Sequence, residues 1–254
     1  MDRINKYGLT FFETSTDSEE GSYLIAKELI EKLFFNMSKL CTKFCNDFFV
    51  DLPYTYRERQ LDCVILPALA KLCNSMVFTE LPSKRFCNNR HFQVDEYNGW
   101  IDYWCLYDNY SFVIELKHSY DCFSNPITDT RTTKRWIEMN NQLESLETEI
   151  KDFGEKTKRV VRIGLHIITS KLKKEPSNQI ITEFNNSISS TFDRLQKDLQ
   201  YNSGKRYPTY KPDLIICWKI PPKIVMKYDE TYPGLWAVAK ICKEIKHKGA
   251  IDGE

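Results

Sequence analysis

Hydrophobic and polar positions along the first third of the chain follow a helical period. Between residues 18 and 49 apolar side chains recur at helical spacing, and Ser18 followed by two acidic residues is typical of a helix start. A second helix is expected at 56–74, where Pro67 should either kink it or start a new segment. Residues 1–16 show no clear period, so we expect them to be irregular.

The rest of the chain alternates between strand-like and helical patterns. We expect strands within 76–96, interrupted at "LPSKR" and "NNR", and then a hairpin at 99–118. The further predicted elements are a loop at 119–130, a helix at 131–151, a strand at 159–170, a helix at 176–200, a strand at 213–220 and a helix at 233–247. This order predicts an α/β fold in which helices cover both faces of one mixed sheet.

Composition narrows the class of protein. The chain has 254 residues, 42% hydrophobic and 28% charged, as in ordinary globular proteins. Its longest apolar run is far shorter than a membrane helix, and its first twenty residues lack the apolar core of a signal peptide. The nine cysteines include no Cys-x-x-Cys pair, which favours free structural thiols over a zinc site or disulfides. We therefore expect a cytoplasmic protein with no membrane partner.

Charge gives a weaker indication of partners. The net charge is +1, although residues 151–174 contain eight basic and two acidic side chains. Such a stretch is more often a solvated face than a nucleic-acid site. At the start of the helix predicted after the hairpin, Lys134 and Arg135 could hold phosphates or form a solvated helix end. His118 and His166 lie within apolar strands, where packing roles are expected.

The predicted hairpin at 99–118 carries charged residues inside apolar strands. The pair 108–109, Asp-Asn, suits a two-residue type I′ turn because both residue types tolerate positive φ. With that turn Asp102 lies directly opposite Glu115. Side chains alternate along a strand and cross-strand partners share a face, so Lys117 should lie on the same face as both carboxylates.

Two opposed carboxylates repel each other, and the hairpin must offset this repulsion. In the same register Trp100 lies opposite Lys117, whose ammonium group can compensate part of the charge. A hard divalent cation between Asp102 and Glu115 would compensate it better, since Mg²⁺ favours one or two carboxylates. An acid pair, a lysine and a metal-bound water together suit the hydrolysis of a phosphodiester.

The motif "GWID" at 99–102, followed after twelve residues by "ELK" at 115–117, resembles the PD-(D/E)XK nuclease superfamily, which has the restriction-endonuclease-like fold. The resemblance implies that Asp102 and Glu115 ligate Mg²⁺, with the carbonyl of Leu116 as a further ligand. It also implies that Lys117 contacts the attacking water.

The resemblance extends to the helices on either side of these strands. Many members carry an acidic residue on the helix before the sheet, for which Glu58 is the best match, with Asp62 one turn later. Many also carry a polar residue on the helix after the lysine, for which Gln142 is the candidate. The family core order, α-β-β-β-α-β, fits residues 56–170. Ile101 stands where the family motif has a proline.

The resemblance implies a Mg²⁺-dependent nuclease, with Mn²⁺ as a substitute ion and DNA favoured over RNA as the nucleic-acid partner. By the same analogy, a bacterial defence or restriction role is expected, with a homodimer or a defence-complex component as protein partner. Residues 1–50 are expected to form an N-terminal irregular segment and helical addition. Residues 51–254 would form the nuclease-like domain, with strand and helix additions at its C-terminal side.

Two alternatives remain open from the sequence. The first is a catalytically inactive nuclease-fold protein that binds nucleic acid or a protein partner. The second makes Asp102 and Glu115 a general acid/base pair for glycoside hydrolysis, which leaves Lys117 without a clear role. The sequence contains no P-loop, Gly-x-Gly-x-x-Gly or Gly-x-Ser-x-Gly motif, which argues against NTPases, Rossmann enzymes and serine hydrolases.

Overall fold

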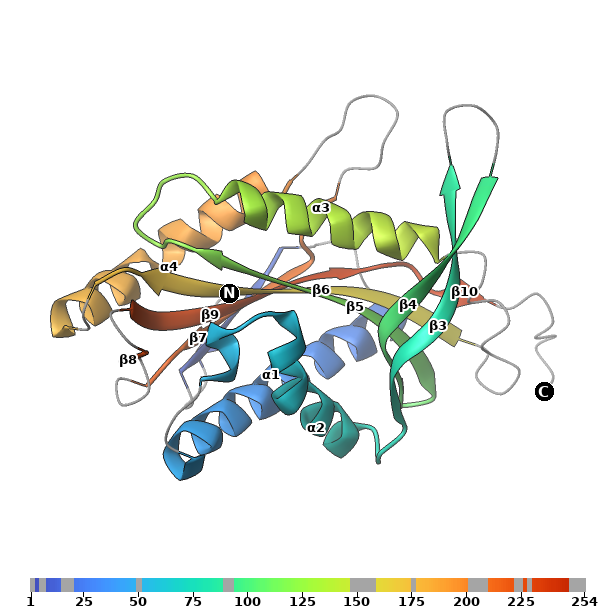
Figure 1. Ribbon diagram of the computed structural model, residues 1–254, viewed down its shortest axis with the longest axis horizontal. Coiled ribbons are helices and arrows are strands. Elements are labelled where there is room, and N and C mark those ends of the chain that lie inside the picture. The colour runs from blue at the N-terminus through green and yellow to red at the C-terminus, as the bar shows by residue number, and fades with distance from the viewer. Residues whose placement is uncertain are drawn as a thin grey trace.

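One mixed sheet lies between two layers of helices in the computed structural model (Figure 1). The structure describes residues 3–4, 8–14, 21–48, 52–88, 94–146, 159–174, 177–200, 210–221, 226–227 and 230–246. The helices are α1 (Gly21–Phe48), α2 (Asp62–Leu72), α3 (Thr130–Ser145) and α4 (Asn178–Asp198), with two short 3₁₀ helices, η1 (Pro53–Thr55) and η2 (Glu58–Leu61). The protein is therefore of the α/β class, as the sequence predicts.

The described residues form a single sheet of ten strands. The strands are β1 (Arg3–Ile4), β2 (Leu9–Glu13), β3 (Val77–Asn88), β4 (Val94–Tyr107), β5 (Tyr110–Asp121), β6 (Arg159–Leu172), β7 (Leu214–Lys219), β8 (Met226–Lys227), β9 (Glu230–Ile241) and β10 (Ile245–Lys246). Their order is β1-β2-β7-β9-β6-β5-β4-β3, with β10 beside β6 and β8 beside β9. Among the described strand pairs only β5 and β6 are parallel, and α3 connects them.

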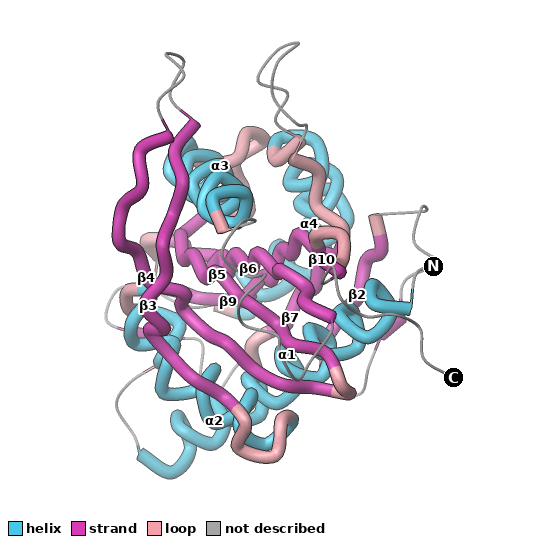
Figure 2. Tube along the Cα trace, turned by 90° about the vertical axis from the view of Figure 1, so that its right-hand side faces the viewer, coloured by secondary structure: helices cyan, strands magenta, loops and turns pink. Residues whose placement is uncertain are grey.

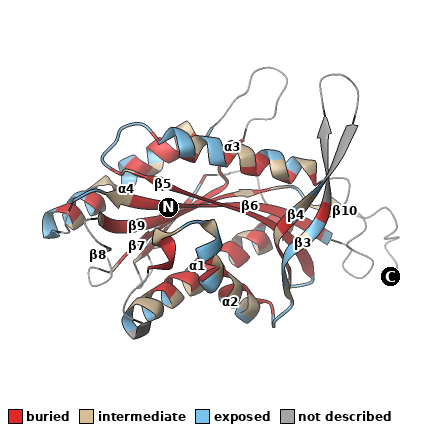
Figure 3. Cartoon of the chain, in the orientation of Figure 1, coloured by how far each residue is buried: buried red, intermediate tan, exposed pale blue. Residues whose placement is uncertain are grey.

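Each face of the sheet is covered by a pair of helices (Figure 2). On one face α1 and α2 bury the larger core, which includes Leu29, Leu33, Val64, Leu69 and Phe112. On the other face α3 and α4 bury a second core, which includes Trp136, Met139, Phe184, Ile188 and Trp236. The central strands are thus buried from both sides (Figure 3), which explains their long apolar runs.

Most of the predicted elements appear close to their expected positions. The helices expected at 18–49, 131–151 and 176–200 correspond to α1, α3 and α4, and the strands expected at 159–170 and 213–220 correspond to β6 and β7. The helix expected at 56–74 is divided into η2 and α2. However, α2 continues through Pro67, so the prediction that a new segment begins at that proline is wrong.

The helix predicted at 233–247 is wrong, because this part of the chain forms β9 and β10 instead. Residues 231–239 of β9 are buried without interruption, between β6 and β7. A segment buried on every side shows neither the alternation of a half-buried strand nor the polar stripe of a surface helix. The hydrophobic pattern alone therefore cannot distinguish the two structures here.

Two other predictions are corrected at the edges of the sheet. Residues 1–16 were expected to be irregular, but Leu9–Glu13 forms β2, which pairs with β7. The interruption expected at 81–85 does not occur, because β3 pairs continuously with β4 on both sides of Glu80. Of the interruption expected at "NNR" (88–90), residues 89–90 lie outside the described residues.

The segment 1–50 shares its sheet and core with the rest of the chain. β2 is part of the sheet, and side chains of α1 belong to the same buried cluster as those of α2 and β5. Of the cysteines, the eight that the structure describes in detail are free, as expected. In the described part of the chain no helix is long and apolar enough to cross a membrane.

Gly234 offers a test of the placement of β9 against α4. A Cβ atom on Gly234 would overlap the ring of Phe184, which is 1% exposed and packed in the second core. We expect Gly234→Ala to lower the free energy of unfolding by about 1–3 kcal/mol, as overpacking does. Gly21→Ala is the control, since its Cβ would lie 3.9 Å from the Tyr110 hydroxyl. Urea unfolding of both variants measures the difference, and equal stabilities would contradict this packing.

Candidate functional site

The hairpin between β4 and β5 has the predicted turn and register at its closed end. Asp108 and Asn109 have φ values of 47° and 63°, and Tyr107 pairs with Tyr110. The paired positions continue as far as Tyr103 and Ile114, as predicted. This part of the prediction is confirmed.

The hairpin does not remain paired as far as the predicted active site. The β4–β5 ladder ends at Tyr103, so the expected pairings of Asp102 with Glu115 and of Trp100 with Lys117 are not formed. β4 turns away and rises with β3 beside the end of α3 (Figure 1). From Glu115 onward, the edge of β5 that faced β4 is therefore released from its partner strand.

Two carboxylates take over the hydrogen bonds that β4 no longer accepts. The backbone N–H of Leu116 donates to Oδ2 of Asp102 at 2.7 Å, and that of His118 donates to Oε2 of Glu58 at 3.1 Å. Backbone donors left unpaired inside a protein cost about 1–3 kcal/mol, so these contacts stabilise the open edge. They also bring two acidic side chains from separate elements, β4 and η2, to successive positions of β5.

Lys117 lies on β5 between Leu116 and His118, whose backbone N–H groups donate to these carboxylates, and is almost fully buried. Its side chain is 8% exposed, and its Nζ donates to the carbonyl oxygen of Leu116 at 2.9 Å. The same Nζ lies 3.9 Å from Oε1 of Glu58. A buried ammonium group requires such partners, because charge is costly to remove from water. The structure therefore brings Asp102, Glu58, Lys117 and the Leu116 carbonyl together.

The segment that carries Glu58 is fixed by hydrogen bonds from β5 and β6. The hydroxyl of Thr169 donates to the carbonyl of Tyr54 at 2.8 Å and lies 2.9 Å from Nε2 of His118. Burial lowers the pKa of His118 to about 4, so its ring is neutral at pH 7. The hydroxyl of Tyr120 contacts the carbonyl of Thr55 at 2.7 Å. Through Thr169, the buried His118 ring is thus linked to η1, which directly precedes η2 in the chain.

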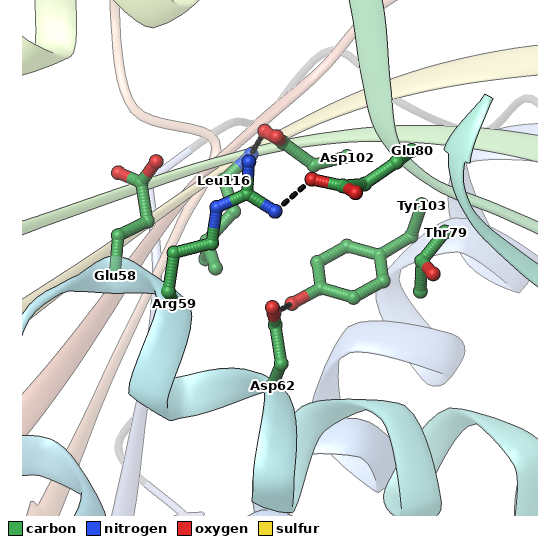
Figure 4. Close-up of a pocket in the computed structure, with 8 residues that line it drawn as sticks. All are labelled: Glu58, Arg59, Asp62, Thr79, Glu80, Asp102, Tyr103 and Leu116. Carbon is green, nitrogen blue, oxygen red and sulfur yellow. Dashed lines mark hydrogen bonds and ion pairs between the residues drawn. The ribbon is translucent and has the colours of Figure 1, made fainter. Parts of the chain in front are cut away.

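A pocket of about 120 Å³ opens where β4 separates from β5 (Figure 4). Its acidic side chains are Glu58, Asp62, Glu80 and Asp102, and its other lining residues are Arg59, Thr79, Tyr103 and Leu116. The hydroxyl of Tyr103 donates to Asp62, and Arg59 forms an ion pair with Glu80. The pocket therefore contains four carboxylates, three of which, Asp62, Glu80 and Asp102, have partners among its lining residues.

Glu80 occupies an unusual backbone conformation within this pocket. Its φ is +52°, in the left-handed region that non-glycine residues rarely adopt. Between the paired positions of β3 and β4 on either side, Glu80 lies opposite Asp102. Such strain, about 1–3 kcal/mol, persists only where the surroundings enforce it and is frequent at functional sites. Here it accompanies the separation of β4 from β5 that opens the pocket.

The electrostatic environment disfavours the charged form of Glu58. Burial raises the pKa of this carboxyl most, and the nearby charge of Asp102 raises it further, against the lowering effect of Lys117. Two carboxylates that share a small pocket repel each other, and a bound cation would relieve this repulsion. The pKa of Tyr103 is also raised, by burial and then by the hydrogen bond to Asp62.

Three predicted site residues do not line this pocket: Lys117, Glu115 and Gln142. Glu115 is 1% exposed and does not line the pocket, although the alternation along β5 places it on the same face as Lys117. Gln142 lies near the end of α3, whereas the first turn of α3 contacts the end of β5 through Thr132 and Ser119. His166, the other histidine expected to pack, is fully buried beside Ser119, and burial lowers its pKa to about 3.

Of four arginines near the site, the sequence singled out only Arg135, and three others come from the structure. Arg57 and Arg59 flank Glu58, and Arg131 and Arg135 extend from the first turns of α3. They line a second pocket, of about 540 Å³, that also includes Glu58. Their spacing of four residues on α3 was visible in the sequence, but their proximity to η2 required the fold. Lys134, by contrast, is 78% exposed and lies 3.9 Å from Glu138.

The donor atoms of the small pocket suit a hard cation such as Mg²⁺. Within the described residues no group of three or more His, Cys, Asp or Glu side chains is arranged to hold a metal ion. Asp102, Glu58 and the Leu116 carbonyl nevertheless offer oxygen atoms of the kind that Mg²⁺ prefers, and Mg²⁺ retains several waters beside one or two carboxylates. A carboxylate has several lone pairs, so accepting one N–H leaves coordination capacity. These residues therefore fit the ion.

Comparisons with known proteins do not assign the chain to a family. No family model matches it, and no curated protein matches it. Among solved structures, the chain is similar to SSO0001, known from a crystal structure, at 15% identity and a TM-score of 0.22. The similarity covers 72% of this chain and 87% of that one. A TM-score this low carries no argument, so function must be inferred from the site.

Proposed function

We propose that this protein is a metal-dependent nuclease that hydrolyses phosphodiester bonds, with DNA as its substrate. One observation carries the proposal: Asp102, Glu58 and Lys117 converge on the open edge of β5 beside an arginine-lined pocket. Acidic groups with a lysine suit metal-assisted attack by water, and arginines suit the phosphates of the substrate.

The order of elements around the site supports a restriction-endonuclease-like fold as part of this proposal. α2, β3, β4, β5, α3 and β6 follow one another in the α-β-β-β-α-β order of the superfamily that the motif resembles. β3, β4 and β5 pair antiparallel in succession, and β6 lies parallel to β5. The candidate residues Asp102 and Lys117 lie on β4 and β5 of this unit, and Glu58 lies on η2 directly before α2.

Each residue has a defined task in this proposal. Asp102, Glu58 and the Leu116 carbonyl would hold Mg²⁺, or Mn²⁺ in its place. When bound, the ion would lower the pKa of a water molecule and offset the charge that develops on the phosphate. Lys117 keeps its Nζ at 2.9 Å from the Leu116 carbonyl, where its remaining protons can orient the attacking water. Burial of Lys117 limits its movement and strengthens its electrostatic effect.

Cleavage assays test this function directly. Purified protein would be incubated with supercoiled plasmid, linear DNA and RNA in the presence of Mg²⁺, Mn²⁺ or EDTA. We expect cleavage of DNA with either ion and none in EDTA. The absence of cleavage under all these conditions, with a folded protein, would overturn the proposal.

A second candidate function is a nuclease-fold protein that binds nucleic acid without cutting it. It is favoured by the present use of both carboxylates as acceptors for backbone amides, which is a structural task. Glu115, the expected second ligand, also lies outside the pocket. Binding of DNA without cleavage in the same assays would support this function. The bacterial defence role and an assembly with a second copy or a defence complex stay predictions from the resemblance.

The stability difference between Glu58→Gln and the wild type should depend on pH. Its direction is set by the raised pKa of Glu58. A carboxyl whose folded-state pKa is raised contributes stability below its ordinary value of 4.5, and this contribution is lost as pH rises through the raised value. Without metal, Glu58→Gln should therefore gain stability relative to the wild type as pH rises from 4 to 8. Thermal unfolding in EDTA across this range measures the difference.

Mg²⁺ provides the control for the Glu58 experiment. The ion should raise the unfolding temperature of the wild type at pH 8 and have a smaller effect on Glu58→Gln, because binding to the folded state stabilises it. A stability difference in EDTA that does not change with pH would contradict the electrostatic account of Glu58.

A further inference from the structure

The arginine-lined pocket beside the candidate active site has the size and charge of a binding site for a nucleotide. Its volume is about 540 Å³, within the range of small-molecule sites. The lining residues are Arg57, Glu58, Arg59, His118, Ser119, Tyr120, Asp129, Arg131 and Arg135. Glu58 and Arg59 also line the small acidic pocket, so a ligand in the larger pocket lies next to the proposed reacting centre.

Two of the four arginines already have ion-pair partners. Arg59 pairs with Glu80, and Nη1 of Arg135 lies 3.0 Å from Oε2 of Glu138. Neither of the two partners, Glu80 and Glu138, lines the larger pocket. Their guanidinium groups can still face a ligand, but part of their charge is compensated.

Arg57 and Arg131 differ from the other two. Among the residues that the structure describes, neither arginine takes part in an ion pair, although both line the pocket. Asp129, the nearest acidic neighbour of Arg131 in sequence, uses its carboxylate to accept the Arg131 backbone N–H at 2.7 Å. Of the four arginines in the lining, Arg57 and Arg131 are thus the two whose charges no ion pair compensates within the described residues.

We propose that this pocket binds the terminal phosphate of a nucleic-acid strand, and that Arg57 and Arg131 recognise its charge. The inference rests on the proposed nuclease function. It adds that the nuclease would act close to the end of a strand. A terminal phosphate monoester carries about two negative charges at neutral pH, whereas an internal phosphodiester carries one, so the two arginines without an ion pair match the charge of a strand end. Arginine also binds phosphate oxygens bidentately.

Binding of the end would position the strand for cleavage close to that end. The shared residues Glu58 and Arg59 place the terminal phosphate beside the pocket of Asp102. The phosphodiester that reaches Asp102 is then one near the bound end. We expect hydrolysis to release short products from the phosphorylated end.

A binding experiment in EDTA tests the pocket without requiring cleavage. The full chain would be titrated with labelled single-stranded oligonucleotides that carry a 5′-phosphate, a 3′-phosphate or hydroxyls at both ends. We expect one phosphorylated end to bind at least about tenfold more tightly than the hydroxyl ends, as a charged hydrogen-bonded contact provides. Inorganic phosphate should compete with that end.

Charge-neutral variants identify the residues responsible. Arg57→Gln and Arg131→Gln should each reduce the preference for the phosphorylated end by about tenfold. Lys134→Gln is the matched control, because it removes one positive charge from the same helix outside the pocket, and it should keep the preference.

The outcomes separate this inference from the proposed function. Equal binding of all three oligonucleotides, or a preference that survives in both arginine variants, would overturn the terminal-phosphate site. Metal-dependent cleavage without any end preference would overturn the inference and support the nuclease. A phosphate preference in a protein that never cleaves would support the pocket and overturn the nuclease.

Discussion

Lys117→Met is expected to reduce DNA cleavage by about 10²–10⁴-fold, the range associated with loss of a group that transfers or orients a proton. Methionine has a similar length and suits the burial of this position, but it has no ammonium group to orient water. Because the four arginines line the larger pocket and Lys117 does not, the affinity for DNA should change little. Single-turnover cleavage and DNA binding in EDTA measure the two effects separately.

Lys134→Met is the control for this variant. Lys134 is exposed on α3 and lies beside Glu138, whereas Lys117 contacts Glu58 and the Leu116 carbonyl, so removal of the Lys134 charge should leave cleavage close to the wild-type rate. Thermal unfolding checks that both proteins are folded. Wild-type cleavage by folded Lys117→Met would show that the ammonium group has no part in the reaction.

The fold was predictable where hydrophobic periodicity and turn chemistry act locally. The Asp108-Asn109 turn follows from the tolerance of both residue types for positive φ, and it determines the register as far as Tyr103. β9 was not predictable in this way, because its contacts with β6 and β7 come from distant parts of the sequence. Its uniform burial removes the periodicity that would identify it.

The candidate site was predictable only where local motif and turn chemistry determine it. Asp102 and Lys117 follow from the motif and the turn, and both lie at the open edge of β5. Their predicted pairing failed because local register cannot show where β4 leaves β5 to follow β3. That separation is accompanied by the left-handed conformation of Glu80, which no sequence rule for strands anticipates.

The separation of β4 also explains why Glu58 rather than Glu115 joins Asp102 in the pocket. Continued pairing of β4 with β5 would satisfy the backbone N–H of Leu116 and His118 through carbonyl groups. Without β4, carboxylates accept these bonds, and Glu58 reaches His118 from η2. The open strand edge therefore both requires the acidic side chains and brings them within reach of a cation.

Two substitutions of Asp102 can separate its structural task from its chemical one. Asp102→Asn keeps an oxygen that can accept the Leu116 N–H but removes the negative charge. Asp102→Ala removes both. We expect both variants to lose cleavage by about 10²-fold or more, because each removes charge from the reacting centre.

Stability should distinguish the same two variants. Asp102→Ala leaves the Leu116 N–H without its acceptor and should lower the free energy of unfolding by about 1–3 kcal/mol, whereas Asp102→Asn should remain within about 1 kcal/mol of the wild type. Urea unfolding and Mg²⁺-dependent cleavage of both proteins provide the measurements. Full cleavage by Asp102→Asn would mean that Asp102 acts only as an acceptor for the strand edge. Loss of cleavage at unchanged stability in Asp102→Asn would assign its charge to the reaction, because the hydrogen bond to β5 would be preserved.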